Sequence, residues 1–312
     1  MAKKVKLGTF NIENLFLRYK LLDNEKGSMH PKPIDWEKFR EEGGTINYFG
    51  TSLPEFGPVS KASRKLTAKV ITENDPDIIA LQEVENLDAL IQFNRVYLKN
   101  NYEYAMVIDG NDPRQIDVGI LSKYPIKSFT THRFDKREDG KPIFSRDCLI
   151  AEVQITKEKT LTILVNHFKS KIGGGEEKRK MQAERVLEIL EERFGKSLNS
   201  EDFVIVGDLN DGNTSEDLKV IVKHKKLENV IERLNEDEQW THYYKKGKSA
   251  EQLDYIIISP TLIEKNKNVL PEIERRGLGN DIDIYEGDRF NKKIEGKDGA
   301  SDHCAVFITL NI

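Results

Sequence analysis

One stretch organises the rest of the chain: Phe203-Val204-Ile205-Val206-Gly207-Asp208-Leu209-Asn210-Asp211-Gly212. Its first four residues are apolar and rich in β-branched side chains, which predicts a buried strand. Polar groups follow where this strand ends, as they do where a crevice at the carboxyl ends of strands binds a ligand. An ordinary turn is the alternative, because Asp, Asn and Gly are also turn formers. The stretch alone does not separate a site from a turn.

The bulk composition describes a soluble chain with a sizeable core. It has 312 residues, of which 38% are hydrophobic and 33% charged. This length allows one large domain or two ordinary ones. Because no repeat, low-complexity tract or linker is visible, we expect a single catalytic domain over residues 1–312. Two polar segments, near 18–58 and 264–298, are expected to be insertions in it.

Charge and cysteine content limit the partners and the compartment. The net charge is −4, so a polyanionic substrate must be held by a local basic patch and not by the global field. Cys148 and Cys304 lie in apolar runs, which favours a reducing compartment and no disulfide framework. No apolar run approaches the length of a membrane span. We therefore expect a cytoplasmic protein, or a secreted one if an export signal has been removed.

Hydrophobic periodicity predicts an alternation of strands and helices. Strands are expected at 5–10, 78–81, 102–108, 116–121, 126–134, 144–155, 161–165, 203–206, 240–244, 252–258 and 304–310. Helices are expected at 60–73, 87–99, 176–194 and 216–222, with a further short one around 36–41. In the second helix, Leu90, Ile91 and Leu98 are expected to face inward. Strands with interspersed helices and a middle run of hairpins predict two mixed sheets packed together, with helices outside.

Acids, amides and imidazoles stand at the ends of many of these strands. They are Asn11, Glu83, Asp117, Asn166, His167, Asp208, Asn210, Asp254 and the segment Ser301-Asp302-His303. One such group is commonplace, but so many in one chain are hard to explain as turns. Oxygen ligands without a thiolate suit Mg²⁺ or Mn²⁺, and histidines near carboxylates suit proton transfer. Together these groups favour phosphate-ester hydrolysis.

The same residues form an ordered set of motifs that resembles a known superfamily. The motifs are Phe10-Asn11-Ile12-Glu13-Asn14, Leu81-Gln82-Glu83-Val84, Asn166-His167, Gly207-Asp208-Leu209-Asn210, Leu253-Asp254-Tyr255 and Ser301-Asp302-His303. They look like those of the endonuclease/exonuclease/phosphatase superfamily, and most like those of its bacterial nuclease-like, deoxyribonuclease I-like members. The resemblance spans residues 5–312. It implies an α/β fold, a four-layer sandwich of two mixed, mostly antiparallel β-sheets packed face to face with helices outside.

The resemblance also implies roles for the motif residues. Glu83 would be the main ligand of Mg²⁺ or Mn²⁺, helped by Asn11 and Asp302. Asp208 and Asn210 would orient the attacking water and contact the scissile phosphate. His303 would be the catalytic imidazole.

Further implied roles concern the surroundings of these residues. Asp254 would hold His303 and raise its basicity. His167 matches a histidine of deoxyribonuclease-like members that pairs with a carboxylate. Asp117 fits this carboxylate and is favoured for the pairing, with a charge at a strand edge as the alternative. Arg146 resembles a phosphate-contacting arginine, and Lys169 adds a second cation for phosphate.

Three hypotheses about the substrate follow. The first is a metal-dependent nuclease that cleaves DNA, with RNA as a second substrate, by in-line attack of an activated water, acting as a monomer. The second is a phosphatase or phosphodiesterase for an inositol phosphate, a sphingomyelin-like lipid or another small ester. An apolar membrane-facing loop would favour a lipid substrate, and none is evident. The third is a non-catalytic binding module, which predicts missing site residues. All of these residues are present, which argues against the third hypothesis. Of the other two we favour the nuclease, and we leave endonuclease or exonuclease action open.

The helix expected at 60–73 carries a run of basic residues: Lys61, Arg64, Lys65 and Lys69. They could track a polyanionic backbone or form a solvated helix face. Trp240, His242, Tyr243 and Tyr244 likewise form an aromatic edge that could stack on bases or pack in the core and its rim.

Overall fold

The computed structural model describes residues 3–18, 55–171, 173–199, 201–290 and 299–312. The short helix expected around 36–41 and most of the first insertion lie outside these residues, as does the end of the second. In the described part of the chain, no helix is long and apolar enough to cross a membrane. Cys148 and Cys304 are both buried and free.

The strands, in chain order, are β1 Lys4–Arg18, β2 Glu55–Pro58, β3 Ile78–Val84, β4 Tyr104–Val107, β5 Asp117–Ser122, β6 Ile126–Thr130, β7 Cys148–Gln154, β8 Thr160–His167, β9 Phe203–Asp208, β10 Glu228–Asn229, β11 His242–Tyr244, β12 Ser249–Glu251, β13 Asp254–Ile258, β14 Glu272–Glu274 and β15 Ala305–Asn311. The α-helices are α2 Lys61–Asn74, α3 Leu87–Tyr97, α4 Glu176–Phe194, α5 Lys219–Val222 and α6 Pro260–Lys265. Two 3₁₀ helices span Val230–Arg233 and Glu236–Glu238.

These strands form two large sheets and one hairpin. Sheet 1 has the order β14-β15-β1-β3-β5-β4, with β2 also paired to β1, and sheet 2 has the order β10-β13-β9-β8-β7-β6. Strands β11 and β12 pair separately. The pairs β1–β3 and β8–β9 are parallel, and the other described pairings are antiparallel. The predicted pair of mixed, mostly antiparallel sheets is therefore confirmed.

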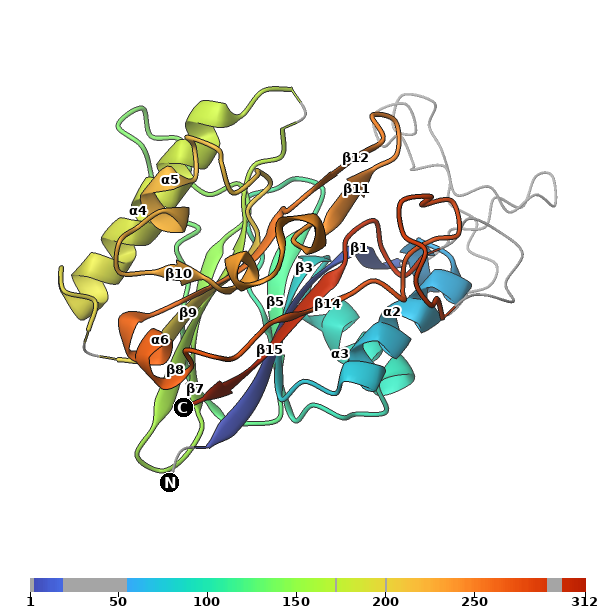
Figure 1. The fold of residues 1–312 in the computed structure, drawn as a ribbon, viewed down its shortest axis with the longest axis horizontal. Helices are drawn as coiled ribbons and strands as arrows, with labels where there is room; N and C mark the ends of the chain where they lie inside the picture. The colour runs from blue at the N-terminus through green and yellow to red at the C-terminus, as the bar shows by residue number, and fades with distance from the viewer. Residues whose placement is uncertain (1–2, 19–54, 172, 200, 291–298) are drawn as a thin grey trace, which may run out of the picture.

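Apolar side chains pack in three layers that separate four layers of structure. Alternate strand residues of both sheets, such as Leu7, Ile120, Leu149 and Val206, form one core between the sheets. Helices α2 and α3 cover the outer face of sheet 1, and α4 and α5 cover that of sheet 2 (Figure 1). This is the predicted four-layer α/β sandwich, and it arises because central strands such as β3, β9 and β13 are buried on both faces.

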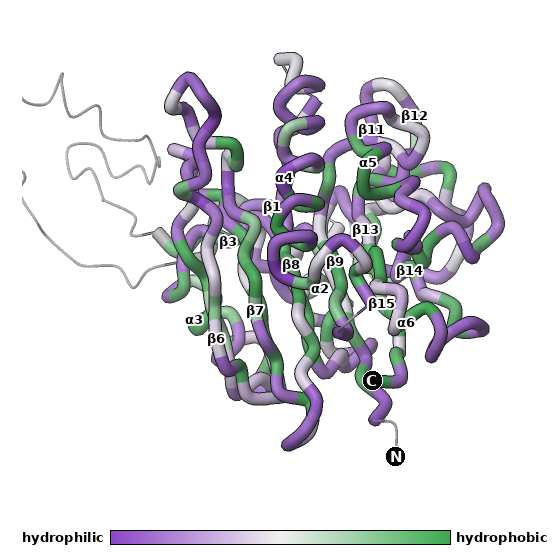
Figure 2. The backbone as a smooth tube through the Cα atoms, turned by 90° about the vertical axis from the view of Figure 1, so that its left-hand side faces the viewer, coloured by the Kyte–Doolittle hydropathy of each residue, from purple (hydrophilic) through white to green (hydrophobic). Residues whose placement is uncertain are grey.

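The two ends of the sandwich differ, because the chain termini lie at one end and the polar groups of the strand ends lie at the other. Both termini lie together at the other end (Figure 1), where Lys3 and Ile312 exchange backbone hydrogen bonds. Figure 2 shows apolar colour concentrated along the strands, and mostly hydrophilic loops at the end far from the termini. The polar groups predicted at the strand ends gather at this far end.

Several local predictions were wrong. The strand expected at 126–134 ends at Thr130, the strand expected at 144–155 begins at Cys148, and the helix expected at 216–222 begins at Lys219. Strand β1 runs on past residue 10 to Arg18, through a register shift between Asn11 and Leu15. Ile91 is 45% exposed, because the helical period turns Leu90 and Phe93 inward and leaves Ile91 to one side.

Candidate active site

Three of the predicted residues meet on sheet 2 because of strand register. Parallel pairing places His167 opposite Asp208, and antiparallel pairing places Asp254 opposite Asp208 from the other side. Gly207, just before Asp208, has a φ of 130°. A Cβ atom there would lie 2.0 Å from the Asn166 carbonyl oxygen. Glycine thus permits the close approach of β8 and β9 that brings these polar ends together.

Asp208 is the centre of the site. Its Oδ2 atom accepts hydrogen bonds from Nδ2 of Asn11 at 3.1 Å and Nδ2 of Asn210 at 3.0 Å. The same oxygen lies 3.4 Å from Nε2 of His167 and 3.8 Å from Nε2 of His303. Burial raises the pKa of the Asp208 carboxyl to about 7 although His303 lowers it. Four nitrogens from both sheets therefore converge on one carboxylate oxygen.

His303 is held from behind by a buried carboxylate. Its Nδ1 lies 2.8 Å from Oδ2 of Asp254, which is fully buried and also accepts a hydrogen bond from the Thr241 hydroxyl at 2.7 Å. Burial alone would lower the pKa of His303, but Asp254 and Asp208 raise it well above its ordinary value. The two carboxylates therefore favour the protonated form of the ring, the imidazolium.

His167 lacks such a carboxylate. Burial lowers its pKa well below the ordinary value, and the positive charges of Arg146 and His303 lower it further. Its Nδ1 has no hydrogen-bond partner among the described residues. Asp117 instead accepts a hydrogen bond from the Gly110 N–H at 2.8 Å, and burial raises its pKa to about 7. The expected pairing of Asp117 with His167 is not formed in this structure, because the Asp117 carboxylate is turned to the loop before β5.

Arg146 is not on the surface of the site. Its side chain is only 3% exposed. It donates from Nη1 to the Phe168 carbonyl oxygen at 2.9 Å and places Nε 3.3 Å from Asp112. Asp112 in turn receives two hydrogen bonds, at 3.0 and 2.9 Å, from Arg114, whose side chain is 65% exposed. The buried arginine thus positions an exposed one, which no sequence motif had indicated.

Lys169 lies beside this arginine pair. Burial lowers its pKa, and Arg146 and Arg114 lower it further, so the cations stand close together. Its Nζ donates to the Ser170 carbonyl oxygen at 3.0 Å.

The predicted metal ligands lie on the sheet 1 side. Glu83, at the end of β3, has a φ of 66° and accepts a hydrogen bond at Oε2 from the Asn14 N–H at 2.9 Å. The Oδ1 atom of Asn11 accepts from the Glu13 N–H at 3.2 Å. Burial raises the pKa of Glu13, and the nearby charges of Asp302 and Glu83 raise it further. Several oxygen donors with excess negative charge fit a hard divalent cation.

Arg64 holds the backbone that carries these acids. It is fully buried, so neither expectation for the basic run, polyanion tracking or a solvated face, applies to it. It donates to the carbonyl oxygens of Ile12 at 2.6 Å and Asn14 at 3.2 Å, and also to that of Glu13. Glu13 and Asn14 both have positive φ, at 49° and 51°. Arg64 therefore stabilises the strained bulge of β1 that orients Glu83.

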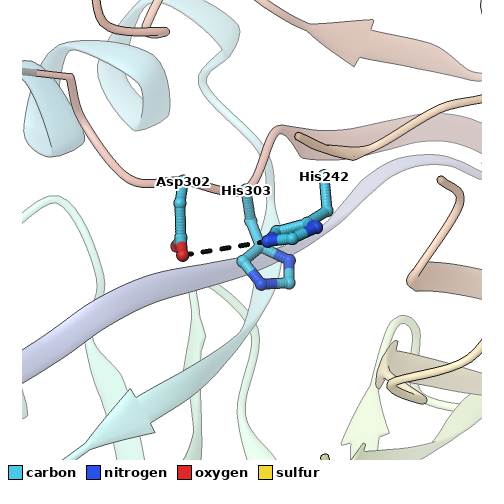
Figure 3. Close-up of side chains that lie close together, drawn as sticks. All are labelled: His242, Asp302 and His303. Atoms are coloured by element: carbon cyan, nitrogen blue, oxygen red, sulfur yellow. Dashed lines mark ion pairs between the residues drawn. The ribbon is translucent and has the colours of Figure 1, made fainter. Parts of the chain in front are cut away.

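His242, on β11, lies next to His303 but makes no contact with Asp208 that the structure records. Figure 3 shows the Asp302 carboxylate turned toward the rings of His242 and His303. The two ring centroids are 4.7 Å apart, and Nε2 of His242 lies 3.9 Å from Oδ2 of Asp302. Burial and the charge of His303 lower the pKa of His242 to about 4. The aromatic edge had suggested base stacking or core packing for this residue, and neither pattern pointed to contact with His303.

Other members of that aromatic edge pack against the protein. The Trp240 ring lies under the guanidinium of Arg275, 4.3 Å from its centre. Tyr243 is buried and donates to Asp283 at 2.9 Å, whereas Tyr244 is 52% exposed.

Two sheets with helices outside, and acids, amides and imidazoles converging at one end, define a phosphoesterase-like α/β sandwich. A model of the Endonuclease/Exonuclease/phosphatase family matches residues 58–311, and the chain belongs to this family. Membership supports a hydrolase of phosphodiester bonds, and members typically use a divalent metal. No curated protein sequence matches the chain at a significant level.

Solved structures share the fold at low sequence identity. Truncated TDP2 from Caenorhabditis elegans superposes with a TM-score of 0.62 and 16% identity, covering 99% of this chain and 98% of that one. The human Nocturnin catalytic domain, solved with a bound sulfate anion, gives 0.61 and 15%, with coverages of 99% and 97%. An endonuclease/exonuclease/phosphatase from Bacteroides vulgatus gives 0.59 and 16%, covering 99% of both chains.

Proposed function

We propose that this protein is a nuclease that uses Mg²⁺ or Mn²⁺ to hydrolyse phosphodiester bonds of nucleic acid, with DNA as the first substrate to test. One observation carries the proposal: Oδ2 of Asp208 is surrounded by nitrogens of two amides and two imidazoles. Such an arrangement fits a water molecule and a phosphate held between a base and several hydrogen-bond donors. We take residues 1–312 as one catalytic domain that acts as a cytoplasmic monomer.

Asp208 positions the attacking water and accepts its proton. A carboxylate with a pKa of about 7 is well matched to proton transfer near neutral pH. The N–H of Asn210 donates to its Oδ1 at 2.8 Å and fixes the carboxylate plane. With Oδ1 fixed in this way, Oδ2 is the oxygen that meets water.

The two imidazoles and Asn210 bind the scissile phosphate. His303, charged because of Asp254, donates from Nε2 to a phosphate oxygen on which charge grows in the transition state. His167 and Asn210 donate from the same side of the site. Their N–H groups turn from Asp208 to the phosphate when substrate enters.

The metal belongs on the sheet 1 side. Glu83, Asn11 and Asp302 would hold Mg²⁺ or Mn²⁺, which when bound neutralises charge on the phosphate and favours departure of the leaving oxygen. The negative charges of Asp302 and Glu83 contribute to the raised pKa of Glu13, and this excess of negative charge supports a cation there.

The surroundings favour a polyanion over a lipid. Arg114, oriented by Asp112, takes the phosphate-contacting role that the sequence suggested for Arg146, and Lys169 stands beside it. The large apolar side chains exposed in the described part of the chain are spread over several elements: Ile91 and Val96 lie on α3, whereas Phe134, Tyr244, Leu270 and Ile284 lie elsewhere. A lipid-directed enzyme would be expected to gather such residues into a patch.

The test is a substrate panel with and without metal. Supercoiled plasmid, linear duplex, single strand and abasic-site oligonucleotides are each incubated with Mg²⁺, Mn²⁺ or EDTA, beside an inositol phosphate and sphingomyelin. We expect metal-dependent cleavage of nucleic acid that is lost in EDTA and in Asp208→Asn. Plasmid nicking separates endonuclease from exonuclease action. Cleavage of only the inositol phosphate or sphingomyelin would overturn the nucleic-acid substrate, and full activity of Asp208→Asn would overturn the site.

A further inference from the structure

We propose that His242, Asp302 and His303 form a second metal site, selective for a transition-metal ion such as Zn²⁺, and that its occupation inhibits the enzyme. The inhibitory effect rests on the function proposed above, whereas the binding site does not. Among the described residues, these three side chains are one of two groups of histidine, cysteine, aspartate or glutamate whose ligand atoms lie close enough together to hold a metal ion.

The donor set distinguishes this site from that of Mg²⁺. Two imidazole nitrogens and one carboxylate oxygen resemble the ligands of zinc sites built from two histidines and one acid, which keep a fourth position open. Magnesium prefers oxygen ligands, and imidazole suits zinc and related ions better. The cluster of Glu83, Asn11 and Asp302 offers oxygen alone. Two neighbouring sites with different preferences therefore share Asp302.

The geometry is close to that of a bound ion. The ligand atoms of the three residues all lie within 4.8 Å of one another. Bonds of 2.0–2.2 Å place tetrahedral donors roughly 3.3–3.6 Å apart, so each pair of ligand atoms must approach by at most about 1.5 Å. Asp302 is 46% exposed and His242 18% exposed on their side chains, which leaves a path for the ion from solvent.

The surroundings fix the donors in place. Asp254 takes the Nδ1–H of His303, so Nε2 is the atom left for a metal, as in zinc sites with a carboxylate behind the ligating histidine. A backbone bridge joins His242 to His303, and the Cys304 N–H donates to the Thr241 carbonyl oxygen at 2.6 Å. The two ligand-bearing segments are therefore paired along their backbones, and a rigid support of this kind favours metal binding.

Occupation would disable the proposed chemistry. An ion here takes Nε2 of His303, which lies 3.8 Å from Asp208, and it takes the carboxylate of Asp302. The imidazolium donor and one ligand of Mg²⁺ are then both lost. His242 itself has no part in the proposed hydrolysis. A substitution of His242 should therefore remove the inhibition and leave the hydrolysis unchanged.

The test compares wild-type protein with His242→Gln, both without a histidine tag. Binding is measured by calorimetric titration with Zn²⁺ and by the visible absorption of bound Co²⁺. His224→Gln, which removes a partly buried histidine on another part of the fold, is the control. We expect His242→Gln to weaken binding by at least about tenfold and to lose the Co²⁺ spectrum, with an unchanged melting temperature. The control variant should bind as wild type.

Inhibition is then read as the Zn²⁺ concentration that halves Mg²⁺-supported nuclease activity. His242→Gln should keep the basal rate and require at least about tenfold more Zn²⁺. Unchanged binding in His242→Gln would overturn the site, and weaker binding with unchanged inhibition would overturn its inhibitory role. If no substrate is cleaved even without Zn²⁺, the proposed nuclease and the inhibition fail together, while loss of binding in His242→Gln still upholds the site.

Discussion

Two buried histidines flank Asp208, and they differ in the group that contacts Nδ1, the ring nitrogen that does not face Asp208. His303 has the Asp254 carboxylate 2.8 Å from Nδ1, and its pKa is raised well above the ordinary value. His167 has no partner on Nδ1 among the described residues and lies near Arg146, and its pKa is lowered. The same side chain at similar distances from one carboxylate thus has opposite protonation states. The surroundings of Nδ1, and not the distance of the ring from Asp208, set the role of each histidine.

The largest effect should come from removing the charged histidine. We expect His303→Gln to lower kcat by at least about 10³-fold, because it removes the cationic donor to the transition state. His167→Gln should cost only about 10- to 10²-fold, since Gln still donates a neutral hydrogen bond. Steady-state kinetics on the cleaved substrate measure both, with melting temperatures as the folding control. Equal losses in the two variants would break the comparison.

The second prediction concerns Asp254→Asn, which changes the pKa of His303 but keeps its imidazole ring. Asp254 raises the pKa of His303, and activity that needs the imidazolium falls as pH rises through that raised pKa. Asp254→Asn removes the carboxylate, so the falling alkaline limb of kcat should move to lower pH. In His167→Gln the limb should stay where wild type has it, because His167 is neutral throughout. A pH–rate profile of each variant decides this, and an unmoved limb in Asp254→Asn would contradict it.

The smallest effect concerns stability, and it sharpens the account of His167. Asp117 has a folded pKa of about 7 against 3.8 for the free group, so the folded state binds more protons and stability falls as pH rises from about 4 through about 7. Asp117→Asn removes the ionisation and keeps an acceptor for the Gly110 N–H. It should be more stable than wild type by ~1–2 kcal/mol at pH 8, or roughly 2–5 °C in Tm, with little difference at pH 4.

A pairing between Asp117 and a charged His167 gives the opposite sign. Asp117→Asn would then be less stable than wild type at neutral pH, because a buried ion pair would be broken. Thermal unfolding at both pH values therefore separates the geometry seen here from the pairing that the resemblance implied.

Much of the fold followed from local patterns. The helix at 176–194 was predicted with the bounds that α4 has, because an amphipathic stretch of this length has one stable way to bury its apolar stripe. Strand β1 was predicted too short, since its continuation past Asn11 depends on Arg64, which bonds the bulge from another element. A bulge held by a distant side chain leaves no periodic signal.

The sequence by itself determined the sandwich and the identity of the polar groups at its strand ends, because alternating apolar residues and polar strand termini are local properties. Only the tertiary structure decided which groups act on one another. It buried Arg146 and exposed Arg114, turned Asp117 to Gly110, and brought His242 against His303. These outcomes depend on burial and on distances between segments remote in the chain. Burial lowers the pKa of both imidazoles, and the Asp254 and Asp208 carboxylates near His303 are what shift its pKa in the opposite direction to that of His167.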